Sequence, residues 1–113
     1  MHELSLCHSV LQILESEARR QGFSRVRRVR LEIGALAGVE PQAMAFGFEV
    51  AMRGSLAEGA QLEIIKAPGQ AWCADCAQPV IIDERYDACP RCQGYQLRVT
   101  GGTELRVKDL EVD

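Results

Sequence analysis

Several features are scarce or missing in this sequence of 113 residues, and each absence narrows the class of protein. No run approaches the roughly 18 consecutive apolar residues that a membrane-spanning helix requires. The opening Met1-His2-Glu3 lacks the basic and then apolar pattern of a signal peptide, so we expect a cytoplasmic protein with no part in the membrane. Low-complexity tracts are also missing, and a hydrophobic fraction of 47% with 26% charged residues is ordinary for a folded globular chain.

Groups that commonly perform catalysis are equally sparse. The sequence has only two histidines, and no serine or cysteine nucleophile is paired with an evident base. No glycine-rich phosphate-binding loop occurs, and the glycines are expected to form turns. We therefore expect a protein that is not an enzyme.

Aromatic residues make up 5% of the chain, and none lies among a local excess of arginines between residues 19 and 30. Single-stranded nucleic-acid sites usually combine cations with aromatic side chains on which bases stack. In the segment 28–33, Arg28, Arg30 and Glu32 alternate with apolar residues, as on the wet face of a half-buried strand. The pattern favours a solvated strand face over a nucleic-acid patch. The arginines concerned are Arg19, Arg20, Arg25, Arg27, Arg28 and Arg30.

Hydrophobic periodicity predicts a first helix over residues 4–21, with Gly22 as its C-cap. On this helix Cys7 faces the core, Ile13 widens the buried stripe, and His8 falls on the opposite, polar face. Pro41 is well placed to start a second helix that runs to about Arg53. Its inward residues are expected to be Met44, Phe48, Ala51 and Met52.

Three strands are expected around these helices, over residues 29–34, 61–66 and 103–112. In the last strand the apolar phase shifts between Val107 and Leu110, which predicts a bulge near Asp109. We expect this strand to return to the sheet of the first domain. The fold class is then α+β, with two helices and a three-stranded sheet.

The remaining segment carries four of the five cysteines in two CxxC turns, with twelve residues between them. This spacing lets Cys73, Cys76, Cys89 and Cys92 close tetrahedrally around one zinc ion. A four-cysteine site leaves no position for a reactive water, so the zinc is expected to be structural. We therefore expect a zinc-ribbon-like module over residues 70–96, inserted into a domain formed by residues 1–69 and 97–113.

Three other interpretations of the cysteines remain open: two disulfides, an iron-binding pair of turns, or a redox motif. Trp72 directly before Cys73 is similar to the tryptophan-led CxxC of thioredoxin-like proteins. That motif opens a helix, whereas Pro79 follows closely here and a second CxxC lies downstream. These features favour zinc.

The amino terminus is a second candidate metal site. The imidazole of His2, its amide nitrogen and the Met1 backbone amine could chelate nickel or copper in fused rings. The bulk of His2 is expected to block removal of Met1, and Glu3 adds a carboxylate. The alternative is a merely exposed and mobile histidine, because a motif this short also arises by chance.

The chain resembles the HypA/HybF family of hydrogenase-maturation nickel metallochaperones over nearly its whole length. The resemblance rests on the two CxxC turns and on four further segments, Met1-His2-Glu3, Ile33-Gly34-Ala35-Leu36, Val39-Glu40-Pro41 and Gly102-Thr103-Glu104-Leu105. The combination of the N-terminal segment with the CxxC turns is the most specific feature. Where the family often has Gly-x-Leu-Ser, this chain has Gly34-Ala35-Leu36-Ala37 and lacks the hydroxyl.

The resemblance implies a metallochaperone whose first domain binds Ni(II) as transient cargo while Zn(II) is structural. It implies that His2 is the essential nickel ligand, that Glu3 supports the site, and that Glu40 lies nearby. It also implies three kinds of partner: a maturation GTPase of the HypB type, the precursor of a [NiFe] hydrogenase large subunit, and, in some members, urease maturation proteins. Nucleic acid is not expected as a partner, and the sequence leaves monomer or homodimer open.

A rival hypothesis is a zinc-ribbon adaptor that binds nucleic acid or protein. The cysteine turns and the arginines fit it, but it leaves His2 without a role. Salt-dependent binding to DNA or RNA would favour this alternative.

Overall fold

The computed structural model describes residues 2–113. No helix in this described part is both long enough and apolar enough to cross a membrane. In chain order the elements are α1 (His2–Gln21), β1 (Val26–Gly34), α2 (Pro41–Met52), β2 (Gln61–Ala67), β3 (Gly69–Cys73), β4 (Gln78–Ile82), β5 (Leu97–Gly101) and β6 (Leu105–Val112).

The chain folds into two compact units. The first comprises the residues up to Leu31 with Val39–Ile64 and Val107–Asp113, and the second comprises Glu32–Gly38 and Ile65–Arg106. The second unit includes the whole of segment 70–96 and extends beyond it on both sides. Two helices, two three-stranded sheets and the four cysteines confirm the predicted α+β fold class.

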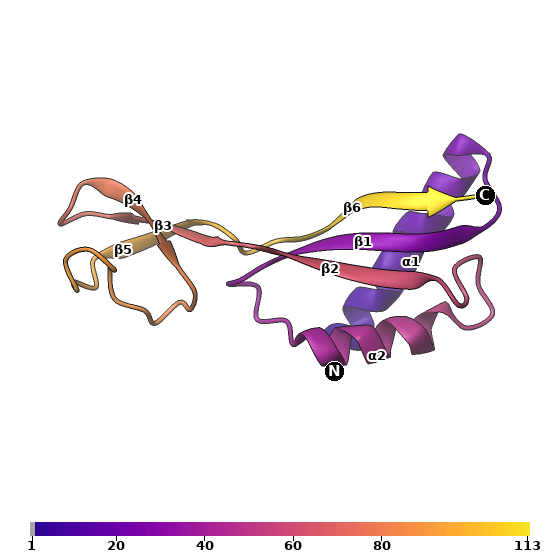
Figure 1. Cartoon of the computed structure of the whole chain (residues 1–113), viewed down its shortest axis with the longest axis horizontal. Coiled ribbons are helices and arrows are strands. Elements are labelled where there is room, and N and C mark those ends of the chain that lie inside the picture. The colour runs from indigo at the N-terminus through magenta and orange to yellow at the C-terminus, as the bar shows by residue number, and fades with distance from the viewer. Residues whose placement is uncertain (1) are drawn as a thin grey trace. The chain divides into compact units, whose positions relative to one another are not determined.

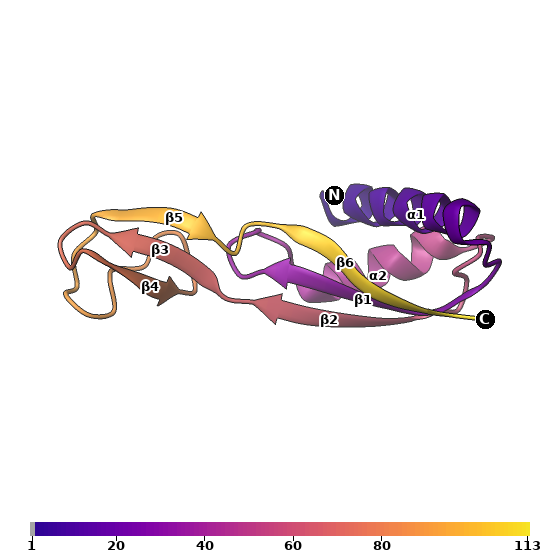
Figure 2. The same ribbon diagram turned by 90° about the horizontal axis from the view of Figure 1, so that it is seen from above.

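In the first unit the strand order is β2-β1-β6, and both helices cover the same face of this sheet (Figures 1 and 2). Strands β1 and β2 point the same way, and α2 is the crossover that two parallel strands need (Figure 2). Cys7 and Leu14 of α1, Leu31 of β1, and the predicted inward residues of α2 are all buried. The predicted pairing of the last strand with this sheet is confirmed.

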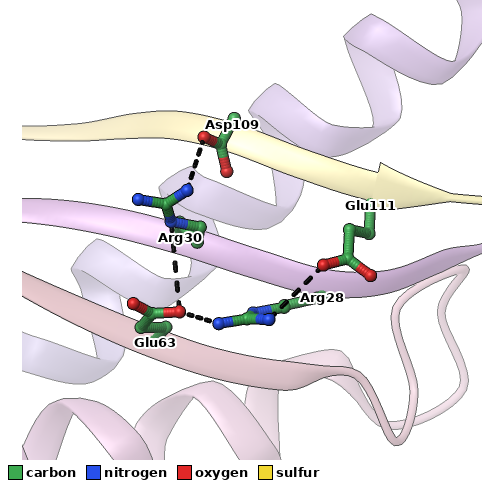
Figure 3. A network of polar contacts seen from close by, with 5 residues as sticks. All are labelled: Arg28, Arg30, Glu63, Asp109 and Glu111. Atoms are coloured by element: carbon green, nitrogen blue, oxygen red, sulfur yellow. Dashed lines mark hydrogen bonds and ion pairs between the residues drawn. The ribbon is translucent and has the colours of Figure 1, made fainter.

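The opposite face of this sheet carries charged side chains. Arg28 of β1 forms ion pairs with Glu63 of β2 and, at 3.4 Å, with Glu111 of β6. Arg30 lies 3.2 Å from Asp109, so both arginines are matched by carboxylates on the neighbouring strands (Figure 3). The interpretation of these arginines as a solvated strand face is confirmed.

Some element bounds and one core residue differ from the sequence predictions. Helix α1 starts at His2 instead of residue 4, which places two of the candidate nickel residues, His2 and Glu3, inside its first turn. Ile13 is 43% exposed, so its predicted burial is wrong; it borders a surface groove shared with Phe23 and Leu110 instead of entering the core. In β6 the half-buried residues Val107 and Leu110 are separated by two exposed ones, in phase with the apolar shift in the sequence, and the bulge near Asp109 stays a prediction.

The second unit is built on a sheet of order β4-β3-β5, in which the central strand pairs antiparallel with both neighbours. Its small core contains Leu36, Ala71, Val80, Ile82 and two cysteines, with Leu97 and Val99 packed against it. Leu36 comes from the loop after β1. The backbone segments beside it are closely packed: a Cβ added to Gly34 would overlap the carbonyl oxygen of Gly102.

Candidate metal centres

Each CxxC segment forms a tight turn that brings its second cysteine back towards the first. In the first turn the amide of Ala77 donates to the carbonyl oxygen of Cys73 at 2.8 Å. In the second, Gln93 donates to the carbonyl oxygen of Cys89 at 2.9 Å. The two turns are therefore closed by the same local hydrogen bond.

Backbone amides also point at the sulfurs. The amide of Cys76 lies 3.4 Å from Sγ of Cys73, and the amide of Arg91 lies 3.4 Å from Sγ of Cys89. Such N–H groups spread the negative charge of a metal-bound thiolate, and they are available because the turn leaves them without carbonyl partners. Both CxxC turns are therefore preorganised for thiolate ligands.

The four sulfur atoms form one compact group. Their Sγ atoms all lie within 4.8 Å of one another, with Cys73 and Cys92 at 3.7 Å and Cys76 and Cys89 at 3.8 Å. A regular tetrahedron with metal–sulfur bonds of about 2.3 Å has edges of about 3.8 Å. The spacing therefore fits a tetrahedral zinc ion and is too long for disulfides, whose sulfurs lie about 2.05 Å apart.

The surroundings of the sulfurs also exclude a thioredoxin-like arrangement. Cys73 ends strand β3, and a turn followed by β4 comes after Cys76, so this CxxC opens no helix. Cys73 and Cys89 are buried, whereas Cys76 is half-buried and Cys92 is exposed. The site thus closes one end of a very small core.

The thiols of this group differ in acidity. Hydrogen bonds from the amides of Cys92 and Arg91 lower the pKa of Cys89 to about 7. Hydrogen bonding to Cys92, together with burial, raises the pKa of Cys76 to about 12. Four neighbouring sulfurs resist ionising together, because each negative charge opposes the next. A divalent metal ion held by the four sulfurs would offset these charges and cross-link the two turns.

The second candidate centre lies at the start of α1. The Met1 amine, predicted as a nickel ligand, lies outside the described residues. The His2 side chain is 56% exposed, and its Nδ1 lies 3.8 Å from Oε2 of Glu3. The same Oε2 accepts a hydrogen bond of 3.1 Å from the backbone amide of Glu40. This amide bond is the main cause of the lowered pKa of Glu3, and the charge of His2 adds to it.

Glu40 approaches Glu3 through its backbone, while its carboxylate caps helix α2. The side-chain Oε2 of Glu40 accepts from the amide of Ala43 at 2.7 Å, and its carbonyl oxygen accepts from Met44 at 2.9 Å. The family resemblance implied that Glu40 lies near the site, and the sequence analysis did not assign it this capping role. The combination of an acidic residue with Pro41 at the first helical position was the available signal.

The other two α1 candidates occupy their predicted environments. His8 is exposed on the polar face, and Cys7 is fully buried with its Sγ 3.7 Å from Sδ of Met44. Burial, together with the charge of Glu3, raises the pKa of Cys7 to about 11. Within residues 2–113, the four cysteines of the CxxC turns form the one group of three or more potential ligands close enough to share an ion.

Comparison with known proteins shows the family to which the chain belongs. The profile of the family described as "Hydrogenase/urease nickel incorporation, metallochaperone, hypA" matches residues 1–112. The hydrogenase maturation factor HypA of Alkalilimnicola ehrlichii is 65% identical over 113 residues, which is 100% of both chains. The corresponding factor of Acidithiobacillus ferrooxidans is 56% identical over the same length, again 100% of both chains.

Solved structures agree with the sequence matches. The solution structure of the Ni metallochaperone HypA from Helicobacter pylori has a TM-score of 0.71 and 25% identity, covering 97% of this chain and 96% of that one. A second solution structure of a HypA protein has a TM-score of 0.69 and 27% identity, covering 99% and 96%. The chain described here therefore belongs to the HypA family of hydrogenase/urease nickel metallochaperones.

Proposed function

We propose that this protein binds Ni(II) at its N-terminus and delivers it in the cytoplasm to the precursor of a nickel enzyme, the large subunit of a [NiFe] hydrogenase. The observation that carries the proposal is membership of a nickel metallochaperone family in a chain whose first helix starts with an exposed histidine. The protein acts as a carrier and not as an enzyme. A GTPase of the HypB type drives transfer, and urease maturation proteins are second recipients.

The proposed nickel site uses His2 as its essential ligand and the Met1 amine as a further one. Glu3 supports the site, and Glu40 lies behind it. The first four amides of a helix have no carbonyl partner within the helix, so the amides at the start of α1 are free to act in a metal site. Nitrogen ligands of this kind suit Ni(II). Exposure of His2 favours release, because a recipient can approach the metal directly.

The four cysteines are proposed to hold structural Zn(II). The two CxxC turns supply four thiolates at the spacing of a tetrahedral site and leave no ligand position open. Because the second unit has only a small apolar core, the ion would provide much of its folding free energy.

Nickel titration by calorimetry on untagged, zinc-loaded protein tests the nickel site. Wild type is expected to bind about one nickel per chain, and His2→Ala is expected to abolish this binding. His8→Ala is the matched control, because His8 is the other histidine, is exposed, and lies on the same helix. Equal binding by wild type and His2→Ala, or no binding by wild type, would reject the proposed site.

The rival adaptor function receives less support from the charges. Arg27, Arg28 and Arg30 each form an ion pair with a carboxylate, so this part of the arginine cluster is electrically compensated. Tight binding of RNA or DNA that weakens steeply with added salt would nevertheless establish the adaptor function.

A further inference from the structure

The first turn of α1 is joined to the start of α2 by a hydrogen bond between residues far apart in the sequence. Oε2 of Glu3 accepts from the backbone amide of Glu40, the N-cap of α2, at 3.1 Å. No helical bond uses an N-cap amide, since helical pairing begins with the amides of the following residues. The Glu3 side chain is only 18% exposed, against 56% for His2. Glu3 therefore belongs to the junction between the helices, while His2 projects from it.

A second contact brings the same turn close to the middle of α2. Gly47 is buried, and a Cβ added there would lie 3.3 Å from Sγ of Cys7, 3.4 Å from Cα of Leu4 and 3.6 Å from the carbonyl oxygen of Glu3. Two of these three neighbours are backbone atoms of the α1 turn that carries the nickel residues. The two backbone atoms would be in ordinary contact with this Cβ, whereas the sulfur of Cys7 would have to move by a few tenths of an ångström. A glycine inside a helix costs about 1 kcal/mol relative to alanine, so its presence fits the limited space here.

We infer that Gly47 and the Glu3–Glu40 hydrogen bond together form a clamp that positions His2 for nickel, with Glu3 acting as a positioning residue and not as a nickel ligand. This inference rests on the proposed nickel function. Gly47 sets how closely the first turn of α1 packs on α2, and the hydrogen bond fixes the end of that turn. Helix ends fray when nothing holds them, and a ligand that is already ordered loses less entropy when it binds a metal.

The clamp predicts which chemical property of the Glu3 side chain is needed for nickel binding. A glutamine side chain keeps a carbonyl oxygen that can accept from the amide of Glu40, but it loses the negative charge that a metal ligand would supply. Alanine loses both. Glu3→Gln should therefore behave like wild type, and Glu3→Ala should not.

Calorimetric nickel titration of the zinc-loaded full chain tests the clamp. We expect Glu3→Gln to keep nickel affinity within about threefold of wild type, and Glu3→Ala and Gly47→Ala each to weaken it about tenfold, as loss of an outer-shell partner typically does. Ala45→Gly is the matched control for helix propensity, because Ala45 is exposed on α2, and it should leave affinity unchanged. The ligand-field absorption of bound nickel should be the same in Glu3→Gln and wild type. This absorption reports which atoms bind the nickel, and a change in protein stability alone would not alter it.

The results separate failure of the clamp from failure of the nickel site. Loss of binding in Glu3→Gln equal to that in Glu3→Ala, with a shifted absorption band, would make the carboxylate a ligand and overturn the clamp while the nickel site stands. Wild-type affinity in Gly47→Ala would likewise overturn it. If wild type and His2→Ala bind nickel equally, the proposed function and the clamp both fail.

Discussion

Ala77 and Gln93 occupy equivalent positions directly after the second cysteine of each CxxC turn, and both have left-handed backbone conformations with φ of 54° and 63°. Among residues 2–113 they are the two positions other than glycine with positive φ. Each donates the hydrogen bond that closes its turn. The geometry of the two CxxC turns thus holds two ordinary residues in a conformation that usually requires glycine.

Replacing one of these residues by glycine should relieve this strain. We expect Gln93→Gly to raise the free energy of unfolding by about 0.5–1 kcal/mol. The left-handed conformation costs an L-residue about 1–2 kcal/mol, and the greater flexibility that glycine gives the unfolded chain offsets part of this gain. Urea denaturation of zinc-loaded protein, followed by Trp72 fluorescence, measures the change. Gln78→Gly in β4 is the control and should destabilise, because Gln78 has an ordinary strand conformation. Destabilisation of equal size in both variants would contradict the prediction.

Removal of zinc by a strong chelator should affect the two units differently. Both helices lie in the first unit, whereas the single tryptophan, Trp72, lies on β3 of the second. We expect Trp72 fluorescence to shift to the red as the cysteine cluster opens, while helical circular dichroism is retained. Parallel loss of both signals at the same chelator concentration would show that the units unfold together.

The crowded backbone at Gly34 predicts that one added methyl group will strongly lower the free energy of unfolding. Gly34→Ala should lower the free energy of unfolding by about 3 kcal/mol or more, because the new Cβ meets backbone that cannot move aside cheaply. Gly38→Ala is the control: its positive φ adds strain of about 1 kcal/mol, but no atom lies within 4 Å of the new Cβ. Urea denaturation compares the two variants, and equal losses would refute the steric explanation.

Cys7 should be inert in the native protein. It is fully buried, and its pKa is raised from 9.0 to about 11, so near neutral pH its thiolate fraction is about 100-fold below that of an ordinary cysteine. We expect iodoacetamide to modify Cys7 at least about 100-fold more slowly than it modifies the same residue in urea-unfolded, zinc-free protein. Mass spectrometry of zinc-loaded samples measures the rate.

The raised pKa of Cys7 also makes the free energy of unfolding depend on pH. Below about pH 9 Cys7 is protonated in both the folded and the unfolded chain, and its contribution does not vary with pH. Between about pH 9 and 11 the unfolded thiol ionises while the folded thiol does not, so stability should fall as pH rises. Cys7→Ala should remove this part of the pH dependence. An unchanged profile in that variant would assign the effect to another group.

Local patterns predicted most of the regular structure. Amphipathic spacing in α1 and Pro41 at the start of α2 each depend on a few neighbouring residues, and both helices were confirmed. The burial of Ile13 was predicted wrongly by the same reasoning. Periodicity shows which residues share a helix face, but the packing of α1 on its neighbours decides how much of that face is covered.

The sequence by itself determined the two CxxC turns, the start of α2 at Pro41 and the helical pattern behind His2, because each depends on contacts between residues only a few positions apart. Tertiary structure decided that Glu3 reaches the amide of Glu40, and that Gly47 lets the first turn of α1 pack closely on α2. These contacts join residues 37 or more positions apart. They depend on how two helices pack on one sheet, which a local pattern does not encode.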